Sequence, residues 1–178
     1  MIRLSWDDPP LDQLHELVAA VAATGGAVGW LTVPLRRDVD GWYATLERFL
    51  GAYDGDRLVG CGSWARQTYS VLVHNAEIRK VMTHPEARGR GVARQVTSAL
   101  IDDARAQGVE VLTLDCRGNN HGALRMYDDL GFVVTGRRPD FIAVGDERFD
   151  QVLLHLDLRE GPSGLVRHGS RREGPGVT

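Results

Sequence analysis

Apolar residues recur at helical spacing in four stretches of the chain. The first follows Pro9-Pro10, the second follows Asp38 and Asp40, the third is ended by Gly108, and the fourth is a short run ended by Gly131. Spacings of three and four residues place such side chains on one face of a helix. The pattern predicts four amphipathic helices, the first two of them ahead of the sheet, on these residues: 11, 14, 17, 18 and 21; 42, 46, 49 and 50; 92, 96, 99, 100 and 104; and the run Ala123 to Leu130.

Short apolar runs between these helices predict strands. The pair Gly51–Tyr53 and Leu58–Trp64 flanks Asp54-Gly55-Asp56, a good hairpin signal. Helices that separate later strands indicate crossovers, so part of the sheet should be parallel. The order predicts an α/β (α+β) domain over residues 1–158 with a mixed sheet, and a disordered polar tail over 159–178. The remaining strands are Glu77 to Thr83, Val109 to Cys116, Phe132 to Thr135 and an alternating run from Val152 to Leu158.

Composition narrows the class of protein. The 178 residues are 43% hydrophobic and 25% charged with a net charge of −3, which gives little attraction for nucleic acid. The uncharged stretch from Leu17 to Leu35 is broken by Gly25-Gly26 and Pro34, so we expect no membrane helix. Nothing near Met1 reads as a secretory signal. Cys61 and Cys116 sit in strand-like runs and are expected to be reduced core thiols, with no metal, in a cytoplasmic protein.

A glycine-rich turn follows the strand that stops at Pro85. It reads Arg88-Gly89-Arg90-Gly91-Val92-Ala93, continues with Arg94, and opens the third helix. Backbone N–H groups at a helix N-terminus suit a phosphate or pyrophosphate, and three arginines add charge, although a purely structural turn is an equal alternative. The turn lacks the Gly-Lys-Ser/Thr ending of a P-loop, and Arg94 stands where a dinucleotide fingerprint needs its third glycine.

Two motifs together carry more information than the turn alone. Arg88-x-x-Gly91-x-Ala93 is followed by Asn120-x-x-Ala123-x-x-x-Tyr127 and by Leu130-Gly131-Phe132. From Arg57 to Leu158 the chain resembles the GNAT superfamily of N-acetyltransferases. The resemblance implies a splayed, mostly antiparallel sheet with a central parallel strand pair, acetyl-CoA in the gap between those two strands, and no metal.

The resemblance also implies which residues hold the coenzyme. Backbone groups around Val81, Met82 and Thr83 should pair with the pantetheine arm. The segment from Arg88 through Ala93, including Gly89, Arg90, Gly91 and Val92, together with Arg94, should hold the pyrophosphate. Asn120 should contact the pantetheine, and it also suits a helix cap.

Acetyl transfer to an amine needs a base for the amine, a donor to the developing oxyanion and an acid for the thiolate. By resemblance, Tyr127 is the general acid, with packing of its ring as the alternative. Glu77 is the candidate base, although an acid at a strand start is often only solvated. Asp115 and His84 are the next candidates for the base, and the backbone N–H of Met82 or its neighbour is expected to be the oxyanion donor.

The acceptor side carries no comparable motif. By analogy, the first two helices with the loop 25–34 and the segment 137–150 should wall it, with acids in the latter and Trp30, Trp42 or Trp64 as possible lining. The layout is similar to small bacterial acetyltransferases of the tabtoxin-resistance type, which implies a small-molecule amine as acceptor. A protein N-terminus or lysine stays open, as does a non-catalytic acyl-CoA sensor. Dimers occur in the family, so a homodimer is compatible with the resemblance.

Overall fold

The computed structural model describes residues 1–25 and 29–159. In this part of the chain, seven strands form one sheet in the order β1-β2-β3-β4-β5-β7-β6. Neighbouring strands are antiparallel except β4 and β5, so the predicted mixed sheet with a central parallel pair is confirmed. The strands are β1 (Ile2–Ser5), β2 (Arg48–Asp54), β3 (Arg57–Arg66), β4 (Asn75–Thr83), β5 (Val111–Arg117), β6 (Val133–Val144) and β7 (Glu147–Asp157).

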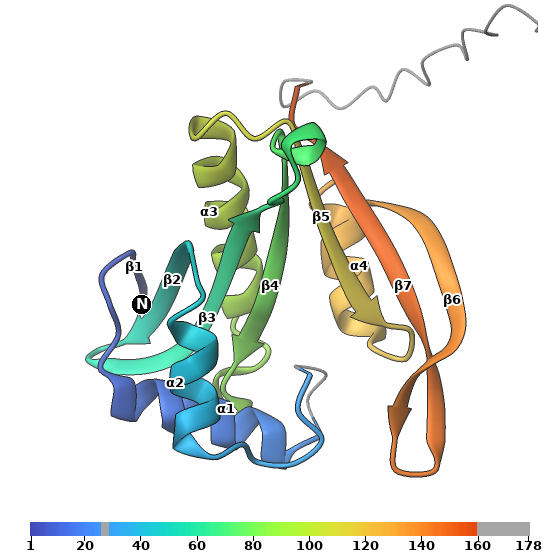
Figure 1. The fold of residues 1–178 in the computed structure, drawn as a ribbon. Coiled ribbons are helices and arrows are strands. Elements are labelled where there is room, and N and C mark those ends of the chain that lie inside the picture. The colour runs from blue at the N-terminus through green and yellow to red at the C-terminus, as the bar shows by residue number, and fades with distance from the viewer. Residues whose placement is uncertain (26–28, 160–178) are drawn as a thin grey trace, which may run out of the picture.

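Helices cover both faces of the sheet (Figure 1). One hydrophobic cluster lies between the sheet and the helices α3 and α4, and a second lies between the sheet and α1 with α2. No helix in the described ranges is long and apolar enough to cross a membrane. The helices are α1 (Leu11–Ala23), α2 (Arg36–Tyr43), α3 (Val92–Ala106) and α4 (His121–Asp129), with short 3-10 turns η1 (Ser70–Leu72) and η2 (Pro85–Ala87).

The second predicted helix is partly wrong. Helix α2 ends at Tyr43, and Phe49 and Leu50 lie in β2. Phe49 packs with α1 and α2, whereas Leu50 packs with α3 and α4 on the opposite face. Adjacent residues that point to opposite faces follow the period of two of a strand. Both faces of the sheet are buried at this point, so two adjacent strand residues are both apolar. They matched the helical pattern for that reason alone.

The sequence pattern predicts the two edge strands of the sheet only in part. Strand β1 precedes α1 and pairs with β2, from Ile2 opposite Asp54 to Ser5 opposite Gly51, so the helices do not come first. Strand β6 runs to Val144, far beyond Thr135, and its side chains are mostly exposed. Exposed strands carry little apolar alternation, which is the signal that sequence patterns report. Much of segment 137–150 therefore belongs to β6 and β7 rather than to a loop.

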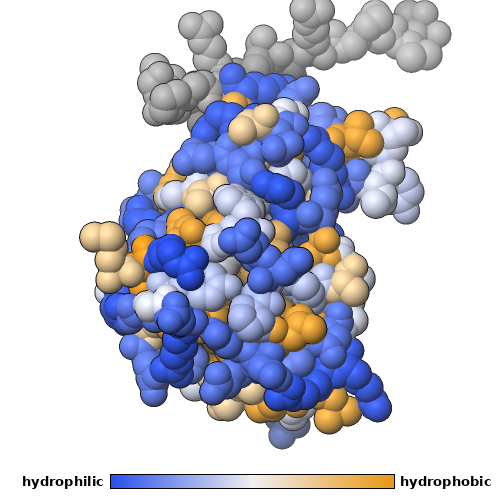
Figure 2. Space-filling view, turned by 90° about the vertical axis from the view of Figure 1, so that its left-hand side faces the viewer, coloured by the Kyte–Doolittle hydropathy of each residue, from blue (hydrophilic) through white to orange (hydrophobic). Residues whose placement is uncertain are grey.

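The tail predicted for 159–178 lies outside the described residues except for Arg159. The face of β1, β2 and the adjoining helices in Figure 2 is mainly hydrophilic, with hydrophobic residues in small groups. Such scattering is ordinary for a protein surface.

Asp103 on α3 anchors the helix to the sheet through charge. Its carboxylate accepts hydrogen bonds from Arg48 Nε at 3.0 Å, Arg48 Nη2 at 2.6 Å and the indole N–H of Trp64 at 2.9 Å. Trp64 is 1% exposed. The predicted alternative role of Trp64 as lining of the acceptor site is therefore wrong, and its ring belongs to the core.

Replacing Asp103 by asparagine should destabilise the fold, because Arg48 would lose its charged partner. The indole N–H of Trp64 would also donate to an uncharged amide oxygen instead of a carboxylate. We expect the free energy of unfolding to fall by about 1.5–3 kcal/mol in urea denaturation. The neighbouring Asp102, which is 76% exposed and pairs with Arg105, is the matched control. Asp102→Asn should cost less than about 0.5 kcal/mol, and equal losses in the two variants would contradict this account.

The parallel pair parts soon after it forms. Strands β4 and β5 are paired only from Asn75 opposite Val111 to Glu77 opposite Thr113. Beyond Glu77 the two strands diverge toward their C-terminal ends, and the sheet opens as an inverted V (Figure 1). This splay confirms the predicted gap between the two central strands.

Candidate functional site

A cavity of about 630 Å³ occupies the gap between β4 and β5. Its walls come from both strands, from the glycine-rich turn with the first turn of α3, and from α4. The described lining residues include Glu77, Arg79, Lys80, Val81, Thr83, Arg88, Gly89, Val92, Ala93, Asp115, Cys116, Asn120 and Tyr127. The structure therefore brings together most of the residues that the two motifs predict.

The glycine-rich turn places the N-terminus of α3 at the cavity. Gly89 and Gly91 have φ of +76° and +75°, a left-handed conformation that L side chains rarely adopt, and Gly91 is the N-cap of α3. The first N–H groups of a helix lack partners within the helix. Whereas α1 and α2 each carry an aspartate in their first turn, α3 carries no acid there. The positive end of α3 is thus left to an anion from outside the helix.

The three arginines of this segment differ in their surroundings. Arg88 lines the cavity and donates a hydrogen bond from Nη2 to the hydroxyl of Thr24 at 2.8 Å. Arg90 pairs with Asp54 at 2.7 Å, and Arg94 pairs with Asp129. Arg90, Arg94 and Gly91 are not among the described residues that line the cavity. Their expected contact with a pyrophosphate stays a prediction.

A bulge in β4 sets which side chains face the cavity. Cys61 of β3 pairs with Met82 and Ser63 pairs with Arg79, so β4 has one extra residue there, and Lys80 has φ of +53°. The bulge reverses the alternation of faces. Met82 is buried against α1 and α2, whereas Val81 packs toward α3. Val81 and Thr83 are among the lining residues of the cavity and Met82 is not, so the expected role of the Met82 backbone N–H as oxyanion donor stays a prediction.

Asn120 and Tyr127 enter the cavity from α4. Asn120 Oδ1 accepts a hydrogen bond from the N–H of Ala123 at 3.3 Å, so the predicted helix cap is present. Tyr127 is 8% exposed, and its ring lies edge-to-face on Phe132 at 5.7 Å between centroids. Burial, and then the nearby Cys116 and Asp115, raise the pKa of the phenol well above its ordinary value. The phenol therefore keeps its proton at neutral pH, as an acid must, and its ring also serves the packing role.

The three candidate bases lie in different places. Glu77 lines the cavity and accepts hydrogen bonds from Arg79 Nε at 2.8 Å and Nη2 at 2.5 Å. Asp115 lines the cavity from β5. His84 is buried at the start of η2, where its Nδ1 accepts a hydrogen bond from the N–H of Glu86 at 3.3 Å. His84 is not among the described residues that line the cavity, so its role as a base stays a prediction.

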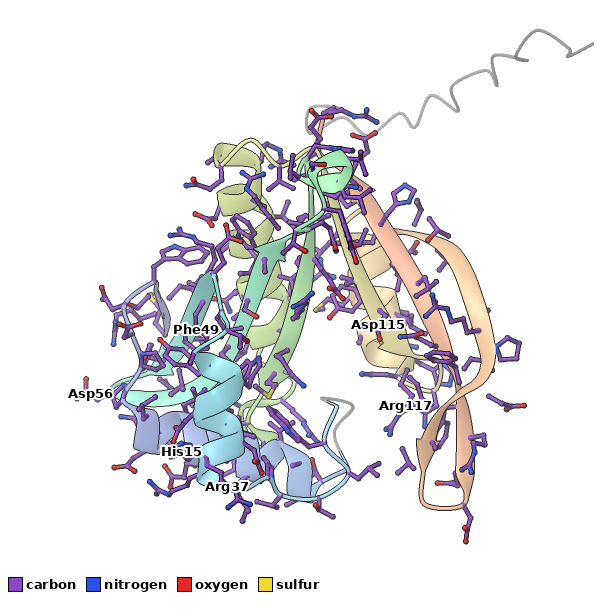
Figure 3. All side chains as sticks on the ribbon, viewed as in Figure 1. His15, Arg37, Phe49, Asp56, Asp115 and Arg117 are labelled. Atoms are coloured by element: carbon purple, nitrogen blue, oxygen red, sulfur yellow. The ribbon has the colours of Figure 1, made fainter. Side chains whose placement is uncertain are left out.

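The face opposite α3 and α4 carries residues that the motifs did not single out. The ammonium of Lys80 lies 4.0 Å from the ring centroid of Trp30, which packs edge-to-face on Trp42 at 5.7 Å. Arg117 of β5 donates to Asn119 Oδ1 at 2.7 Å and to the carbonyl of Gly25 at 3.2 Å, across the gap from β5 to the end of α1. Figure 3 shows Asp115 and Arg117 on β5 beside the gap. A lone lysine within a strand was the one sequence signal available for Lys80.

The predicted acceptor wall can be compared with the cavity only for its described residues. Residues 26–28 of the loop lie outside the described residues. The acids of segment 137–150 (Asp140, Asp146, Glu147 and Asp150) are not among the described lining residues of the cavity. Within the described ranges, no group of three or more histidine, cysteine or acidic side chains is placed to hold a metal ion.

The two cysteines should be unreactive in the native protein. Both are buried free thiols, and burial raises the pKa of Cys116 to about 11 and that of Cys61 further. At about pH 8 the thiolate fraction of Cys116 is then about a thousandth. A disulfide thiol reagent should therefore react slowly with the folded protein and titrate 2 thiols per chain after denaturation. Fast, stoichiometric labelling of the folded protein would contradict the burial described here.

Comparisons with known proteins agree with this geometry. The sequence model of the "Acetyltransferase (GNAT) family" matches residues 7–132. The chain is 31% identical over 99 residues to the L-amino acid N-acyltransferase MnaT of Escherichia coli K12, covering 56% of each chain. It is 32% identical over 80 residues to the L-methionine sulfoximine/L-methionine sulfone acetyltransferase of Salmonella typhimurium, covering 45% of this chain and 47% of the relative. The chain thus spans about half the length of these curated relatives.

Solved structures share the fold. A putative phosphinothricin N-acetyltransferase superposes with a TM-score of 0.81 at 18% identity, covering 90% of this chain and 100% of that one. The protein yncA of Salmonella typhimurium, a putative acetyltransferase solved with its cofactor acetyl-CoA, gives a TM-score of 0.79 at 22% identity over 92% of this chain and 98% of that one. Because the family model covers most of the chain and the splayed sheet is present, the chain belongs to the GNAT acetyltransferase family.

Proposed function

We propose that this protein is an N-acetyltransferase that moves the acetyl group of acetyl-CoA directly onto a primary amine of a small molecule. The observation that carries the proposal is the cavity between β4 and β5, which joins the acid-free N-terminus of α3, the buried phenol of Tyr127 and the carboxylates of Glu77 and Asp115. We assign this activity to one catalytic domain, residues 1–158. Two free buried thiols fit a reducing compartment, the cytoplasm.

The donor would lie along β4 in the gap. Its pyrophosphate would accept hydrogen bonds from the backbone of the turn 88–93, with Arg88 as the arginine of that turn that lines the cavity. The pantetheine would follow the backbone of residues 81–83. At these residues β5 is no longer paired with β4, so the edge of β4 is available to a ligand. Asn120 lines the same cavity and can contact the pantetheine while it caps α4.

The reaction would need no covalent enzyme intermediate. Glu77, directly or through a water, would take a proton from the ammonium of the acceptor, and the neutral amine would attack the thioester carbon. The backbone N–H of Met82 or its neighbour would stabilise the oxyanion. When the C–S bond breaks, the electron pair goes to sulfur, and Tyr127 would protonate the thiolate. The second proton that the attacking nitrogen must lose to become a neutral amide would pass, directly or through a water, to the phenolate of Tyr127 and restore the phenol. The raised pKa of Tyr127 keeps it in the form that can donate this proton.

Two acceptor classes are represented among the relatives. MnaT and the methionine sulfoximine acetyltransferase are named for amino acids or their analogues. The ribosomal protein bS18-alanine N-acetyltransferase of Escherichia coli, 27% identical over 88 residues, is named for a protein. We favour a small acceptor because Arg117 reaches across to Gly25, which narrows the acceptor side of the gap.

The test is acetyl transfer from acetyl-CoA across small amines, aminoglycosides, amino acids and peptides, with thiol release and product mass measured together. Turnover of a small amine class supports the proposal, whereas turnover confined to peptides favours the protein acceptor. Acetyl-CoA that raises the melting temperature without turnover on any amine would instead indicate a binding module that senses acyl-CoA.

A further inference from the structure

Arg88 differs from the other two arginines of the glycine-rich turn in the group that orients it. Arg90 and Arg94 each pair with a carboxylate. Arg88 instead donates a hydrogen bond from Nη2 to the uncharged hydroxyl of Thr24 at 2.8 Å, and among the described residues it has no carboxylate partner. The positive charge of Arg88 therefore stays available to an anion in the cavity that this residue lines.

Thr24 is the residue at which α1 ends. Its hydroxyl donates its proton to the carbonyl of Val21 at 2.9 Å, so the oxygen meets Arg88 as an acceptor. Helix α1 has no basic side chain in its last turn, and the carbonyl end of a helix attracts a cation. Arg88, 64 residues further along the chain, supplies that cation. The hydrogen bond and the helix end thus hold the guanidinium in one place.

The same end of α1 is fixed from the opposite wall of the gap. Arg117 of β5 donates to the carbonyl of Gly25 at 3.2 Å, and its Cζ lies 4.9 Å from the ring centroid of Phe149 on β7. In Figure 1, this end of α1 lies toward the open side of the gap between β4 and β5. Because Thr24 directly precedes Gly25, the group that orients Arg88 is itself anchored by contacts that do not involve Arg88.

We propose that Thr24 is a positioning residue for the coenzyme, which holds Arg88 toward the pyrophosphate without neutralising its charge. The inference rests on the proposed binding of acetyl-CoA and adds to that site a residue of α1, outside both coenzyme motifs. A guanidinium presents several N–H donors in a planar fork, so Nη2 can stay on Thr24 while other donors reach phosphate oxygens. An arginine loses side-chain freedom when it binds a phosphate, and one that is already held in place loses less.

The test is calorimetric titration of acetyl-CoA into the full chain. Thr24→Val removes the hydroxyl and keeps the branched shape, so the dissociation constant should rise by about three- to tenfold. Thr24→Ser keeps the hydroxyl and should stay within about twofold of the wild type. In an Arg88→Met background, Thr24→Val should change the constant by less than about twofold, because the group that it positions is gone. With saturating acetyl-CoA, kcat of Thr24→Val should equal that of the wild type, since its hydroxyl acts through Arg88 and not on the reacting atoms.

Thr45 is the matched control. It follows α2 as Thr24 follows α1, it is also exposed, and its hydroxyl donates to the carbonyl of Trp42 at 2.7 Å. Thr45 is not among the described residues that line the cavity. Thr45→Val should therefore leave the affinity for acetyl-CoA unchanged.

An unchanged or tighter affinity in Thr24→Val would overturn the inference, because Thr24 would then be idle or would hold Arg88 away from the pyrophosphate. An equal loss in Thr24→Ser, or a loss that persists in the Arg88→Met background, would overturn it as well. In each of these cases the acetyl transfer would stand. A wild-type protein that binds no acetyl-CoA would overturn the proposed function, and the role of Thr24 with it.

Discussion

Replacing Tyr127 by phenylalanine is expected to lower kcat by about 10²–10⁴-fold, the usual contribution of a positioned acid. The KM for acetyl-CoA should stay within about twofold of the wild-type value, because the phenol acts mainly when the thiolate leaves. The phenylalanine ring keeps the edge-to-face contact with Phe132, so the fold should be preserved. Steady-state thiol release with saturating acceptor measures the effect, and a melting curve with acetyl-CoA checks that the donor still binds.

Tyr43 offers a matched control for this substitution. It too lies edge-to-face on a phenylalanine, Phe49, at 5.3 Å, and burial raises the pKa of its phenol. Its hydroxyl binds Asp8, away from the cavity. Tyr43→Phe should retain the wild-type kcat. If Tyr127→Phe did the same, a water or another group would have to protonate the thiolate, and Tyr127 would be left with packing alone.

Replacing Ala93 by aspartate is expected to weaken acetyl-CoA binding by about 10–100-fold, through repulsion of the pyrophosphate and loss of a charge-assisted contact. Ala93 lines the cavity in the first turn of α3, which carries no acid. An acid at this end of a helix is favourable by about 0.3–1 kcal/mol, which offsets the lower helix propensity of aspartate. Binding should therefore fall while the free energy of unfolding stays within about 0.5 kcal/mol. Calorimetric titration and urea denaturation measure the two quantities.

Gln95 supplies the control, since it is exposed on the same helix and outside the cavity walls of the described chain. Gln95→Asp makes the same change in net charge, but its effect on acetyl-CoA affinity should be below about threefold, because salt screens an exposed charge. Equal losses of affinity in the two variants would mean that net charge, rather than contact at the helix N-terminus, governs binding.

The elements that the sequence predicts well are those with a single buried face. Helices α1 and α3 bury the predicted apolar residues, among them Leu14 and Leu17 in α1 and Val96 and Leu100 in α3. Prediction failed where burial gives no periodic signal. Phe49 and Leu50 are buried on opposite faces of β2, and β6 is mostly exposed along its whole length.

The candidate site divides in the same way. The donor side is encoded by residues close together in the sequence, such as Gly89 and Gly91, which need positive φ before a helix. The acceptor side is assembled from distant segments, with Arg117 contacting Gly25 from 92 residues away. The orientation of Lys80 depends on a one-residue bulge in β4 that no short-range pattern in this sequence predicts. Contacts of this kind follow from tertiary packing, so the sequence alone could not place them.

The most direct test of the central claim is a crystal structure of this protein with acetyl-CoA. We expect the pyrophosphate on the backbone N–H groups of the turn 88–93, the pantetheine beside residues 81–83 in the gap between β4 and β5, and the thioester sulfur facing the phenol of Tyr127. Acetyl-CoA bound outside the gap, or in the gap with its thioester turned away from Tyr127 and Glu77, would contradict the assignment of this cavity as the site of acetyl transfer.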